Sequence, residues 1–366
     1  MPDVIVVGGG VIGLSIAHAA AARGRSVTVL DPGDPANAAS WAAAGMLAPL
    51  SESEHPDPLF ELCEASLRLY RCWAGRLQTQ SGIDPEYDES GLLCLANSKQ
   101  ALNLLKKRMS WHQAAGFTSE LLTPEDIRRL EPNLTLDITG GLYMPGEFQV
   151  RPRRLLEALR TACSESGVEI QSGQRVRAVL FDNDHVAGVE TESGKVAGDC
   201  VVIASGVRST EILGLRPRLR MKARKGQMLS LMAPMPLFRH LIRWEHSYMV
   251  QRKDGELVVG ATNEDTGLDR SITPAGIGGL LERAQQISSH TASFAIREMW
   301  TGLRPATPDG LPVLGHSAIP GLIYATGHYR NGILLAPITA SIVTALIEKE
   351  QPPLSLDAFA AARFDV

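Results

Sequence analysis

The sequence lacks the patterns that mark disulfide-stabilised or metal-dependent proteins. Its five cysteines (Cys63, Cys72, Cys94, Cys163 and Cys200) form no CxxC pair and no other metal-ligand spacing. An odd number of cysteines without a secretion signal indicates reduced thiols in a cytoplasmic protein. The nine histidines include no HExxH motif, so no metal site is expected.

The chain also lacks an excess of positive charge. Its formal net charge is −4 at pH 7, which argues against a nucleic-acid partner, because such binders usually present a basic face. No internal repeat and no low-complexity linker is recognisable. With 366 residues, of which 44% are hydrophobic and 21% charged, the composition predicts an ordinary globular protein of two domains or two interwoven lobes.

No segment fits a secretion signal or a membrane anchor. The segment from Val4 to Ala22 is almost wholly apolar, but Asp3 precedes it, no basic residue does, and three consecutive glycines, Ser15 and His18 interrupt it. A signal peptide begins with positive charge, and a membrane span needs about 20 apolar residues. We therefore expect neither, and no membrane partner.

The start of the chain does contain a pattern for binding a dinucleotide. The apolar segment Val4–Val7 leads into GGGVIG at positions 8–13, and a second apolar segment, 27–30, ends at Asp31. This order predicts a strand, a glycine turn, a helix, a second strand and a terminal acid, as in βαβ nucleotide-binding folds. The alternative is a glycine-rich turn in an ordinary α/β core.

Each residue of this pattern has a predicted role. Gly8 permits the tight turn, Gly10 lets the backbone approach a pyrophosphate, and Gly13 lets the helix pack close to the strand. The helix N-terminus would face the phosphates with free N–H groups and its positive dipole end. Asp31 lies 18 positions after Gly13 and would accept hydrogen bonds from a ribose.

Further along, helical and strand-like segments alternate. Helices are expected over about 60–80, 101–116, 152–167, 275–289 and 336–349, and from Thr123-Pro124 onward. Strands are expected at 91–96, 168–170, 176–180, 186–192 and 322–325, and in a second sheet at 226–231, 247–252 and 257–261 with a hairpin turn at Asp254-Gly255. The apolar run 200–203 is typical of a central parallel strand buried on both faces. Its Ala-Ser-Gly end either approaches a cofactor or forms a plain turn.

Two segments in the last part of the chain are more specific than the glycine motif. The stretch GLRPATPDGLPVLG at 302–315 and the stretch ATGHYRNGILLAP at 325–337 resemble the flavin-contacting end of the D-amino-acid oxidase family. The stretches AAAGML at 42–47, ASGV at 204–207, HSYMV at 246–250 and VVGAT at 258–262 resemble more closely the branch of that family that serves thiamine biosynthesis. The resemblance spans nearly the whole chain.

The resemblance implies an α/β fold in which a Rossmann-like FAD-binding domain is interleaved with a β-rich substrate domain, as in D-amino-acid oxidases. Residues 1–85, 145–222 and 295–366 would form the FAD-binding domain, and residues 86–144 and 223–294 the substrate-binding domain. Family members with covalent flavin carry a cysteine between the GLRP-type strand and the C-terminal loop. No cysteine follows Cys200, so non-covalent FAD is expected.

The residues expected to contact FAD come from both ends of the chain. A second glycine-rich loop at 327–332 favours FAD over NAD, and by resemblance it lies against the flavin ring. Its N–H groups and a helix N-terminus from Ile333 would stabilise negative charge on the reduced flavin. The expected contacts are Gly8, Gly10, Val11, Ile12, Gly13, Asp31, Ala39, Ser40, Ala44, Gly45, Met46, Val176, Gly206, Gly327, His328, Tyr329, Arg330, Asn331, Gly332, Ile333 and Leu334.

The resemblance also implies which residues bind the substrate. Arg304 matches the family position that clamps a carboxylate, for which a guanidinium offers two coplanar donors, and Tyr248 matches the hydroxyl that shares it. Arg330 matches a second residue at the substrate mouth, although it could instead pair with a local acid. His328 would shape the flavin pocket through its backbone, because the family pattern requires no general base and no protein residue reacts. His246 would be structural or lie at the pocket rim.

The resemblance is loose at one further position, Asn263, which is expected to face the pocket. Substrate preference is therefore open there. Glycine, sarcosine and small D-amino acids are not distinguished, because one methylene in an apolar pocket is worth only about 1–3 kcal/mol.

The implied reaction is the oxidation of glycine or a small amine with FAD and O2. The products would be an oxo acid, ammonia or an amine, and H2O2, and the imine would be available for thiamine thiazole synthesis. The alternatives are a dehydrogenase of the same fold that passes electrons to a quinone, a flavin-binding subunit without turnover, and an NAD(P) enzyme. Family members form dimers or tetramers, so a homo-oligomer is expected without a defined number of subunits.

Overall fold

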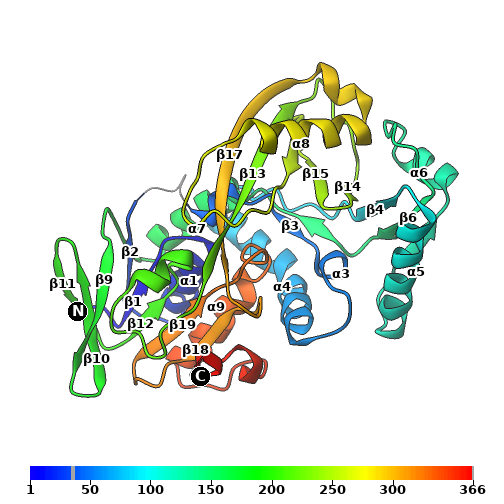
Figure 1. The fold of residues 1–366 in the computed structure, drawn as a ribbon. Coiled ribbons are helices and arrows are strands. Elements are labelled where there is room, and N and C mark those ends of the chain that lie inside the picture. Colours follow the sequence, from blue (N-terminus) through cyan, green and yellow to red (C-terminus); the bar gives the residue numbers. More distant parts are fainter. Residues whose placement is uncertain (34–37, 365–366) are drawn as a thin grey trace.

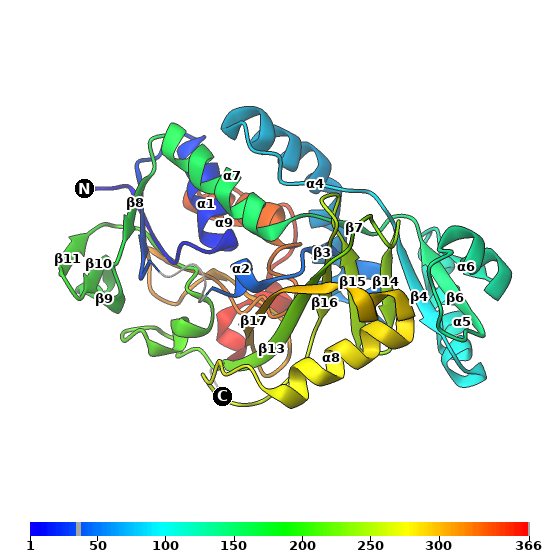
Figure 2. The same ribbon diagram turned by 90° about the horizontal axis from the view of Figure 1, so that it is seen from above.

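The computed structural model describes residues 1–33 and 38–364, and two large sheets dominate this part of the chain (Figure 1 and Figure 2). The chain passes between the two sheets several times. Strands of the first sheet come from the beginning, the middle and the last part of the sequence.

The six-stranded sheet contains the βαβ unit predicted at the start of the chain. Its strand order is β18-β19-β12-β1-β2-β8, and all neighbours pair in parallel except β18 with β19. The prediction for 200–203 is confirmed, because β12 lies between β1 and β19 and all its residues are buried. The strands are β1 (Val4–Val7), β2 (Val27–Asp31), β8 (Glu169–Ser172), β12 (Val201–Ile203), β18 (Val313–His316) and β19 (Leu322–Thr326).

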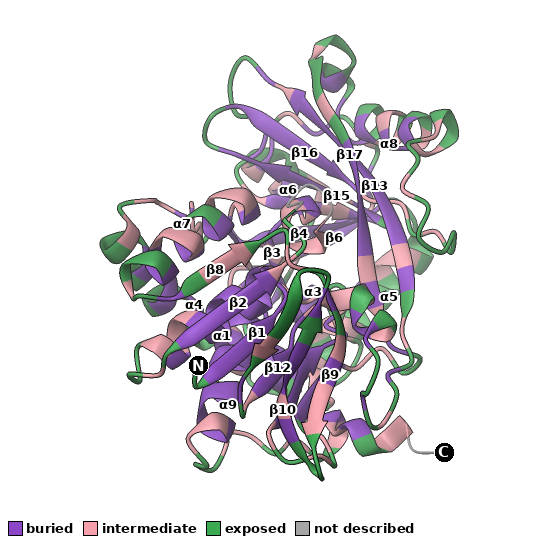
Figure 3. Cartoon of the chain, turned by 90° about the vertical axis from the view of Figure 1, so that its left-hand side faces the viewer, coloured by how far each residue is buried: buried purple, intermediate pink, exposed green. Residues whose placement is uncertain are grey.

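Alternate residues of β1 pack against two different layers. Val4 and Val6 belong to a core shared with helices, whereas Ile5 and Val7 belong to a core shared with a small antiparallel sheet. Burial on both faces explains the uninterrupted apolar sequence of this strand, and Figure 3 shows β1 and β12 as buried strands. The helices are α1 (Val11–Ala21), α4 (Pro58–Ser81), α7 (Pro152–Glu165) and α9 (Ala336–Ile347).

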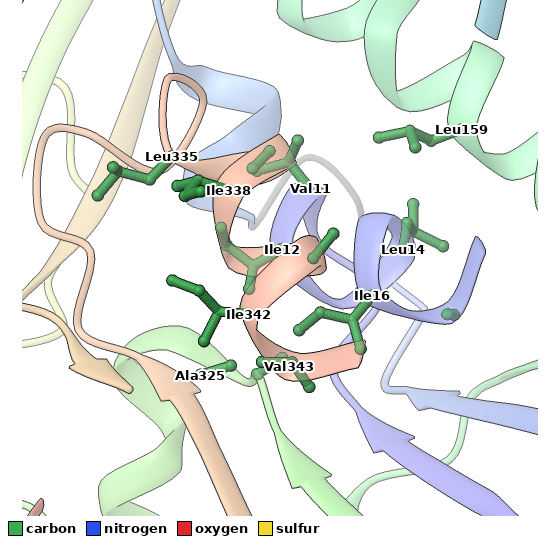
Figure 4. Close-up of a cluster of buried hydrophobic side chains, with 14 of the residues drawn as sticks. Val11, Ile12, Leu14, Ile16, Leu159, Ala325, Leu335, Ile338, Ile342 and Val343 are labelled. Atoms are coloured by element: carbon green, nitrogen blue, oxygen red, sulfur yellow. The ribbon is translucent and has the colours of Figure 1, made fainter. Parts of the chain in front are cut away.

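Helix α1 is apolar on nearly every side because α7, α9 and the sheet surround it. Figure 4 shows its side chains against those of α9, with Leu159 of α7 near Leu14. This packing fixes the start of α1, at Val11, immediately after the glycine turn.

The small antiparallel sheet has the order β11-β10-β9, and its strands β9 and β10 confirm the strands expected at 176–180 and 186–192. Its strands are β9 (Val176–Asp182), β10 (His185–Thr191) and β11 (Gly194–Ala197). The turn between β10 and β11 contains only two residues, because Thr191 already pairs with Gly194.

The eight-stranded sheet has the order β17-β13-β16-β15-β14-β4-β6-β5. Its longest pairing joins β13 to β17 in antiparallel register, and the predicted hairpin at Asp254-Gly255 joins β15 to β16. The strands are β4 (Leu92–Ala96), β5 (Glu120–Leu122), β6 (Gly140–Met144), β13 (Lys222–Met232), β14 (Leu241–Trp244), β15 (Ser247–Gln251), β16 (Glu256–Gly260) and β17 (Ala295–Ala306).

The two faces of this sheet have different neighbours. Leu229 of β13 packs with Ile277 and Leu280 of helix α8 (Pro274–Ile287), whereas the adjacent Met228 packs on the opposite face with Ala42 and Ala44. The second face therefore points toward the segment that follows β2. Two further helices, α5 (Lys99–Ala114) and α6 (Pro124–Leu130), lie at the β4–β6 end (Figure 1).

The predicted helices are confirmed within a few residues at each end. Thr123 caps α6 through a reciprocal pair of hydrogen bonds with Asp126. The shorter elements are α2 (Ala39–Ala42), α3 (Pro49–Glu52), the paired strands β3 (Met46–Leu47) and β7 (Phe148–Gln149), and the 3₁₀ helices η2 (Gly206–Glu211), η3 (Ser289–Ser293), η4 (Asp357–Phe359) and η5 (Ala361–Phe364).

The division into two interleaved domains stays a proposal. Sheet membership supports it for most strands: β1, β2, β8, β12, β18 and β19 all come from the ranges assigned to the FAD-binding domain. Strand β17 differs, since it lies in a range expected to belong to the FAD-binding domain but pairs with β13 in the eight-stranded sheet.

Candidate cofactor and substrate site

One large cavity of about 720 Å³ lies between the two sheets. Its lining includes the glycine turn after β1, the segment after β2, the end of β12, the loop after β19 and the second face of the eight-stranded sheet. A volume of this size is typical of a site for a cofactor or a drug-sized ligand. The residues expected to contact the cofactor line this cavity, except Gly13 and Leu334.

The glycine turn has the geometry that its sequence predicts. Gly8 has a positive φ of 113°, and a Cβ there would lie 2.6 Å from the carbonyl oxygen of Ala204, the residue that follows β12. Gly13 lies behind the turn, where a Cβ would overlap the Gly8 carbonyl oxygen. Its absence from the lining therefore fits its predicted role in packing α1 against β1.

Helix α1 directs its N-terminus at the cavity. The N-cap is Gly10, which as a glycine has no side chain to cap the helix. The first turn contains no acidic residue. The N–H of Val11 donates to Ser40 Oγ at 3.1 Å. Because Gly8, Gly10, Val11 and Ile12 all line the cavity, this end offers N–H donors and a positive dipole to an anion.

Asp31 is fixed at the wall of the cavity. Its two carboxylate oxygens accept from the N–H of Gly9 at 2.7 Å and the N–H of Gly33 at 2.8 Å. Each carboxylate oxygen has a further lone pair, so the side chain can still accept from a ribose hydroxyl, as the sequence predicts.

The small-residue segment after β2 forms a second wall. Ala39, Ser40, Ala44, Gly45 and Met46 all line the cavity. Gly45 has a φ of 83°, and a Cβ there would overlap the Val150 carbonyl oxygen, so only glycine fits. The remaining wall on this side includes Val176, at the start of β9, and Gly206, at the start of η2.

The loop after β19 is tied to the end of β17. The N–H of Tyr329 donates to the Pro305 carbonyl at 3.1 Å, and Ala306 forms an antiparallel bridge with His328. Positive φ values at Gly327 (75°) and Tyr329 (47°) turn the backbone so that the loop 327–332 lines the cavity. The two family-like segments therefore meet in space.

Two expectations for this loop are wrong. Helix α9 begins at Ala336, as the expected range 336–349 has it, and the helix N-terminus expected at Ile333 is wrong because residues 332–335 form turns first. Leu334 does not line the cavity: it is buried on the side of α4, where its carbonyl accepts from Ser66 Oγ at 2.6 Å.

One ring nitrogen of His328 is engaged with helix α9. The side chain is buried, and its Nε2 lies 3.1 Å from Thr339 Oγ1. Burial lowers the pKa of this imidazole to about 3, so it is neutral near pH 7. This agrees with the expectation that His328 shapes the pocket and does not act as a base.

Arg304 and Tyr248 project from the eight-stranded sheet at the other end of the cavity. Glycines on neighbouring strands make room for both: a Cβ on Gly226 would overlap the Arg304 guanidinium, and a Cβ on Gly260, which pairs with Tyr248, would overlap the Tyr248 ring. Burial raises the pKa of Tyr248, against the lowering effect of Arg304. The hydroxyl therefore stays protonated and able to donate.

The Arg304 guanidinium has no carboxylate partner within residues 1–33 and 38–364. Its Nη1 donates to the Thr262 carbonyl at 3.2 Å, which fixes the side chain without neutralising it. An uncompensated cation that faces a cavity can bind a carboxylate with two parallel hydrogen bonds.

Arg330 does have a local acid, the alternative that the sequence left open. Its guanidinium lies 3.2 Å from Glu52, whose other oxygen lies 2.7 Å from Arg243. All three side chains line the cavity. Sequence reasoning missed Glu52 and Arg243, because their ion pair joins segments 191 positions apart and no local motif marks it.

The structure agrees with the expected position of His246 but not with that of Asn263. His246 is exposed and lines the cavity, in agreement with a place at the pocket rim. The expectation for Asn263 is wrong: this residue is exposed and does not line the cavity, because the chain from Thr262 to Glu264 continues alongside β13 and leaves the side chain in solvent.

The lining of the cavity contains no cysteine within the described ranges, 1–33 and 38–364. All five cysteines have free thiols, and the same ranges contain no cluster of His, Cys, Asp and Glu that could hold a metal ion. No helix in this part of the chain is long and apolar enough to cross a membrane.

Comparison with known proteins gives a consistent result. A model of the family "FAD dependent oxidoreductase" matches residues 3–346. The chain is 38% identical over 367 residues to "Bifunctional protein ThiO/ThiG" of Trichormus variabilis, covering 99% of this chain and 55% of that protein. It is 34% identical to "Glycine oxidase" of Geobacillus kaustophilus, covering 99% of this chain and 97% of that protein.

The solved structures agree with the sequence relatives. The crystal structure of glycine oxidase from Geobacillus kaustophilus superimposes with a TM-score of 0.95 at 34% identity, and the match covers 99% of this chain and 98% of that one. The chain spans about half the length of the bifunctional relatives and nearly all of the glycine oxidases.

Proposed function

Because the chain belongs to the family of FAD dependent oxidoreductases, we propose that it oxidises glycine and other small amines to oxo acids with O2 as the electron acceptor. The observation that carries the proposal is the guanidinium of Arg304, which has no acid partner within the described residues and lies beside Tyr248 in the cavity. The names of relatives that match over their full length support it.

The residues present fit FAD. Replacing any of Gly8, Gly13 or Gly45 with a larger residue would drive a Cβ into backbone atoms that frame the cavity, and the N-terminus of α1 presents donors for a pyrophosphate. When bound, FAD supplies the two-electron acceptor for the amine and then passes the electrons to O2, which becomes H2O2. The absence of cysteine from the described lining supports non-covalent binding.

The protein's own contribution is to bind and orient the substrate. Arg304 would bind the substrate carboxylate through two donors while Tyr248 donates to the same group. A substrate held this way has its amine and α-carbon inside the cavity that Met46 and the loop 327–332 also line. Fixed orientation of this kind accounts for a large part of the rate of reactions between bound partners.

The substrate amine must be neutral to give up a hydride from its α-carbon, and no protein base is required inside the site. His328 does not serve as one, because its pKa of about 3 makes it a weak base. For glycine the balance is one O2 and one H2O consumed, and one glyoxylate, one ammonia and one H2O2 formed.

The biological setting is a further part of the proposal. The resemblance to the thiamine branch, together with relatives named ThiO/ThiG, supports a role in which the imine product is used for thiamine thiazole synthesis. We also propose a cytoplasmic location and a homo-oligomer, a dimer or a tetramer.

Oxygen consumption by the purified protein tests the proposed reaction. Glycine, sarcosine and D-alanine are supplied in air-saturated buffer, and a soluble quinone replaces O2 in a parallel anaerobic series. We expect O2 uptake matched by H2O2 with at least one of the three amines, and slower turnover with the quinone. Faster turnover with the quinone would favour the dehydrogenase alternative, and no turnover with either acceptor would favour a flavin-binding subunit.

A further inference from the structure

The side chain of Lys225, in the middle of β13, is an unusual feature that the proposed chemistry does not use. Its side chain is 1% exposed, and its ammonium lies 3.1 Å from Glu264, 3.1 Å from Asp269 and 3.2 Å from the Ser271 carbonyl. The residue does not line the cavity. A buried ammonium is costly unless it is paired in good geometry, so the partners indicate what this cation holds in place.

Both acidic partners belong to one loop, which we define as residues 264–269. Backbone hydrogen bonds of 2.9 Å in both directions join Lys225 to Glu264 at the start of the loop, and the ammonium reaches Asp269 at its end. Residues 265–268 between these anchors are exposed, and Leu268 lines the cavity. The ammonium of Lys225 therefore closes the neck of the loop.

The first anchor is connected to Thr262. The Glu264 carboxylate accepts from Thr262 Oγ1 at 2.5 Å and from Gln227 Nε2 at 2.8 Å. Thr262 is also held by its backbone, since its N–H donates to the Gln227 carbonyl and its Oγ1 accepts from the Gln227 N–H. Every polar group of Thr262 except its carbonyl is thus fixed against β13 or Glu264.

The remaining group, the Thr262 carbonyl, accepts from Arg304 Nη1 at 3.2 Å. This is the hydrogen bond that orients the guanidinium in the cavity. A continuous series of contacts therefore runs from the buried ammonium through Glu264 and Thr262 to the proposed carboxylate clamp.

We propose that Lys225 is a positioning residue for substrate carboxylate recognition: by holding Glu264 and Thr262 in place, it fixes the carbonyl that aims Arg304. The inference rests on the proposed function of Arg304. A bidentate pair depends on the alignment of a planar group at the end of a long flexible side chain. Loss of the anchor therefore weakens carboxylate binding although the positive charge of Arg304 remains.

The test compares Lys225→Met with the wild-type holoprotein. Glycolate serves as the probe, because it carries a carboxylate but no amine, and its dissociation constant is measured from the change in the flavin spectrum. We expect glycolate to bind at least about tenfold more weakly, and the limiting rate of flavin reduction by glycine to stay within about threefold. Lys225→Arg, which keeps the cation and several donors, is expected to restore most of the affinity.

Arg224→Met is the matched control. Arg224 is the neighbour of Lys225 and lies 3.0 Å from Asp265 of the same loop, but its ion pair is partly exposed and lies outside the series that leads to Thr262. Glycolate affinity is expected to be unchanged in this variant. An equal loss in Arg224→Met and Lys225→Met would overturn the proposal, because it would show that any loosening of the loop has the same effect.

Other outcomes are also decisive. A Lys225→Met protein with a lower melting temperature but a glycolate affinity within about twofold of wild type overturns the inference and leaves Lys225 a purely structural residue. If that variant yields no flavoprotein, Glu264→Gln replaces it: the amide keeps the shape but loses the charge attraction to Lys225. We then expect about threefold weaker glycolate binding or more, and unchanged binding contradicts us.

The inference and the proposed function fail in different ways. If wild type does not bind glycolate, or if Arg304→Met binds it normally, the proposed function of the clamp is wrong. If wild type binds glycolate, Arg304→Met binds it more weakly and Lys225→Met binds it as tightly as wild type, only the positioning role is wrong.

Discussion

Replacing Arg304 with methionine removes the guanidinium that we place at the substrate carboxylate. Methionine keeps most of the length of the side chain and stays compatible with the space above Gly226. Hydrogen bonds to charged groups contribute about 1.5–3 kcal/mol each, so the loss of two parallel bonds to a carboxylate costs about 3–6 kcal/mol. The expected fall in kcat/KM for glycine is roughly two to four orders of magnitude.

The structure predicts a small effect of the same change on stability. Arg304 makes one hydrogen bond, to the Thr262 carbonyl, and no ion pair within the described residues. Because no acid among the described residues pairs with this half-buried guanidinium, its removal leaves no buried anion without a partner. The melting temperature and the FAD content of the variant should therefore stay close to those of the wild type.

The assay is the rate of flavin reduction by glycine in the absence of air, measured over a range of glycine concentrations. Arg304→Lys keeps the charge but not the planar pair of donors, so an intermediate loss of about 10- to 100-fold is expected. Arg224→Met serves as the control, because Arg224 pairs with Arg304 across β13 and β17 but does not line the cavity. The reasoning is refuted if Arg304→Met retains its flavin and is reduced by glycine as efficiently as wild type.

Three further predictions follow from single contacts. Tyr248→Phe removes one hydroxyl donor to the substrate carboxylate, which costs about 1.5–3 kcal/mol and should lower kcat/KM about 10- to 150-fold. Steady-state kinetics with glycine would show no change if the hydroxyl has no role. Gly13→Val places a side chain against the Gly8 carbonyl and should abolish FAD binding or folding, whereas a variant purified with a full complement of FAD would contradict the packing argument. Burial raises the pKa of Glu147 to about 8, although its carboxylate accepts from the N–H groups of Leu50 and Ser51. Because this value lies above the pKa of 4.5 in the unfolded chain, wild type should lose stability relative to Glu147→Gln as the pH rises from about 5 to 8. A difference in melting temperature between the two proteins that does not change with pH would exclude this.

The βαβ unit and the glycine turn that line the cavity could be predicted from the sequence because their signals are local. The order of strand, glycine turn, helix, strand and acid fixes the βαβ unit within about 30 residues, and the glycines are required by backbone overlap at Gly8, Gly13 and Gly45. The proposed roles of Arg304 and Tyr248 could not be inferred from local pattern. They came from a resemblance, and the structure adds the reason both fit, namely the glycines at 226 and 260.

The residues that were missed depend on contacts between distant segments. Glu52 and Arg243 meet across 191 positions, and Lys225 reaches Asp269 across 44. The helix expected over 336–349 starts where α9 does, but the helix N-terminus expected at Ile333 is wrong for a different reason. Leu335, the N-cap of α9, has no side-chain hydrogen bond, so the sequence carries no capping signal at that boundary. Asn263 shows that facing a pocket depends on the path of the backbone and not on the identity of neighbouring residues.

The most direct test of the proposed reaction is a single turnover without air. The purified protein is mixed with glycine under anaerobic conditions, and the flavin absorbance and the glyoxylate formed are measured together. We predict that the flavin bleaches and that one glyoxylate appears for each flavin reduced, with H2O2 formed only after air is admitted. A protein that contains FAD and binds glycolate, but whose flavin is not bleached by glycine, sarcosine or D-alanine, would contradict the proposal.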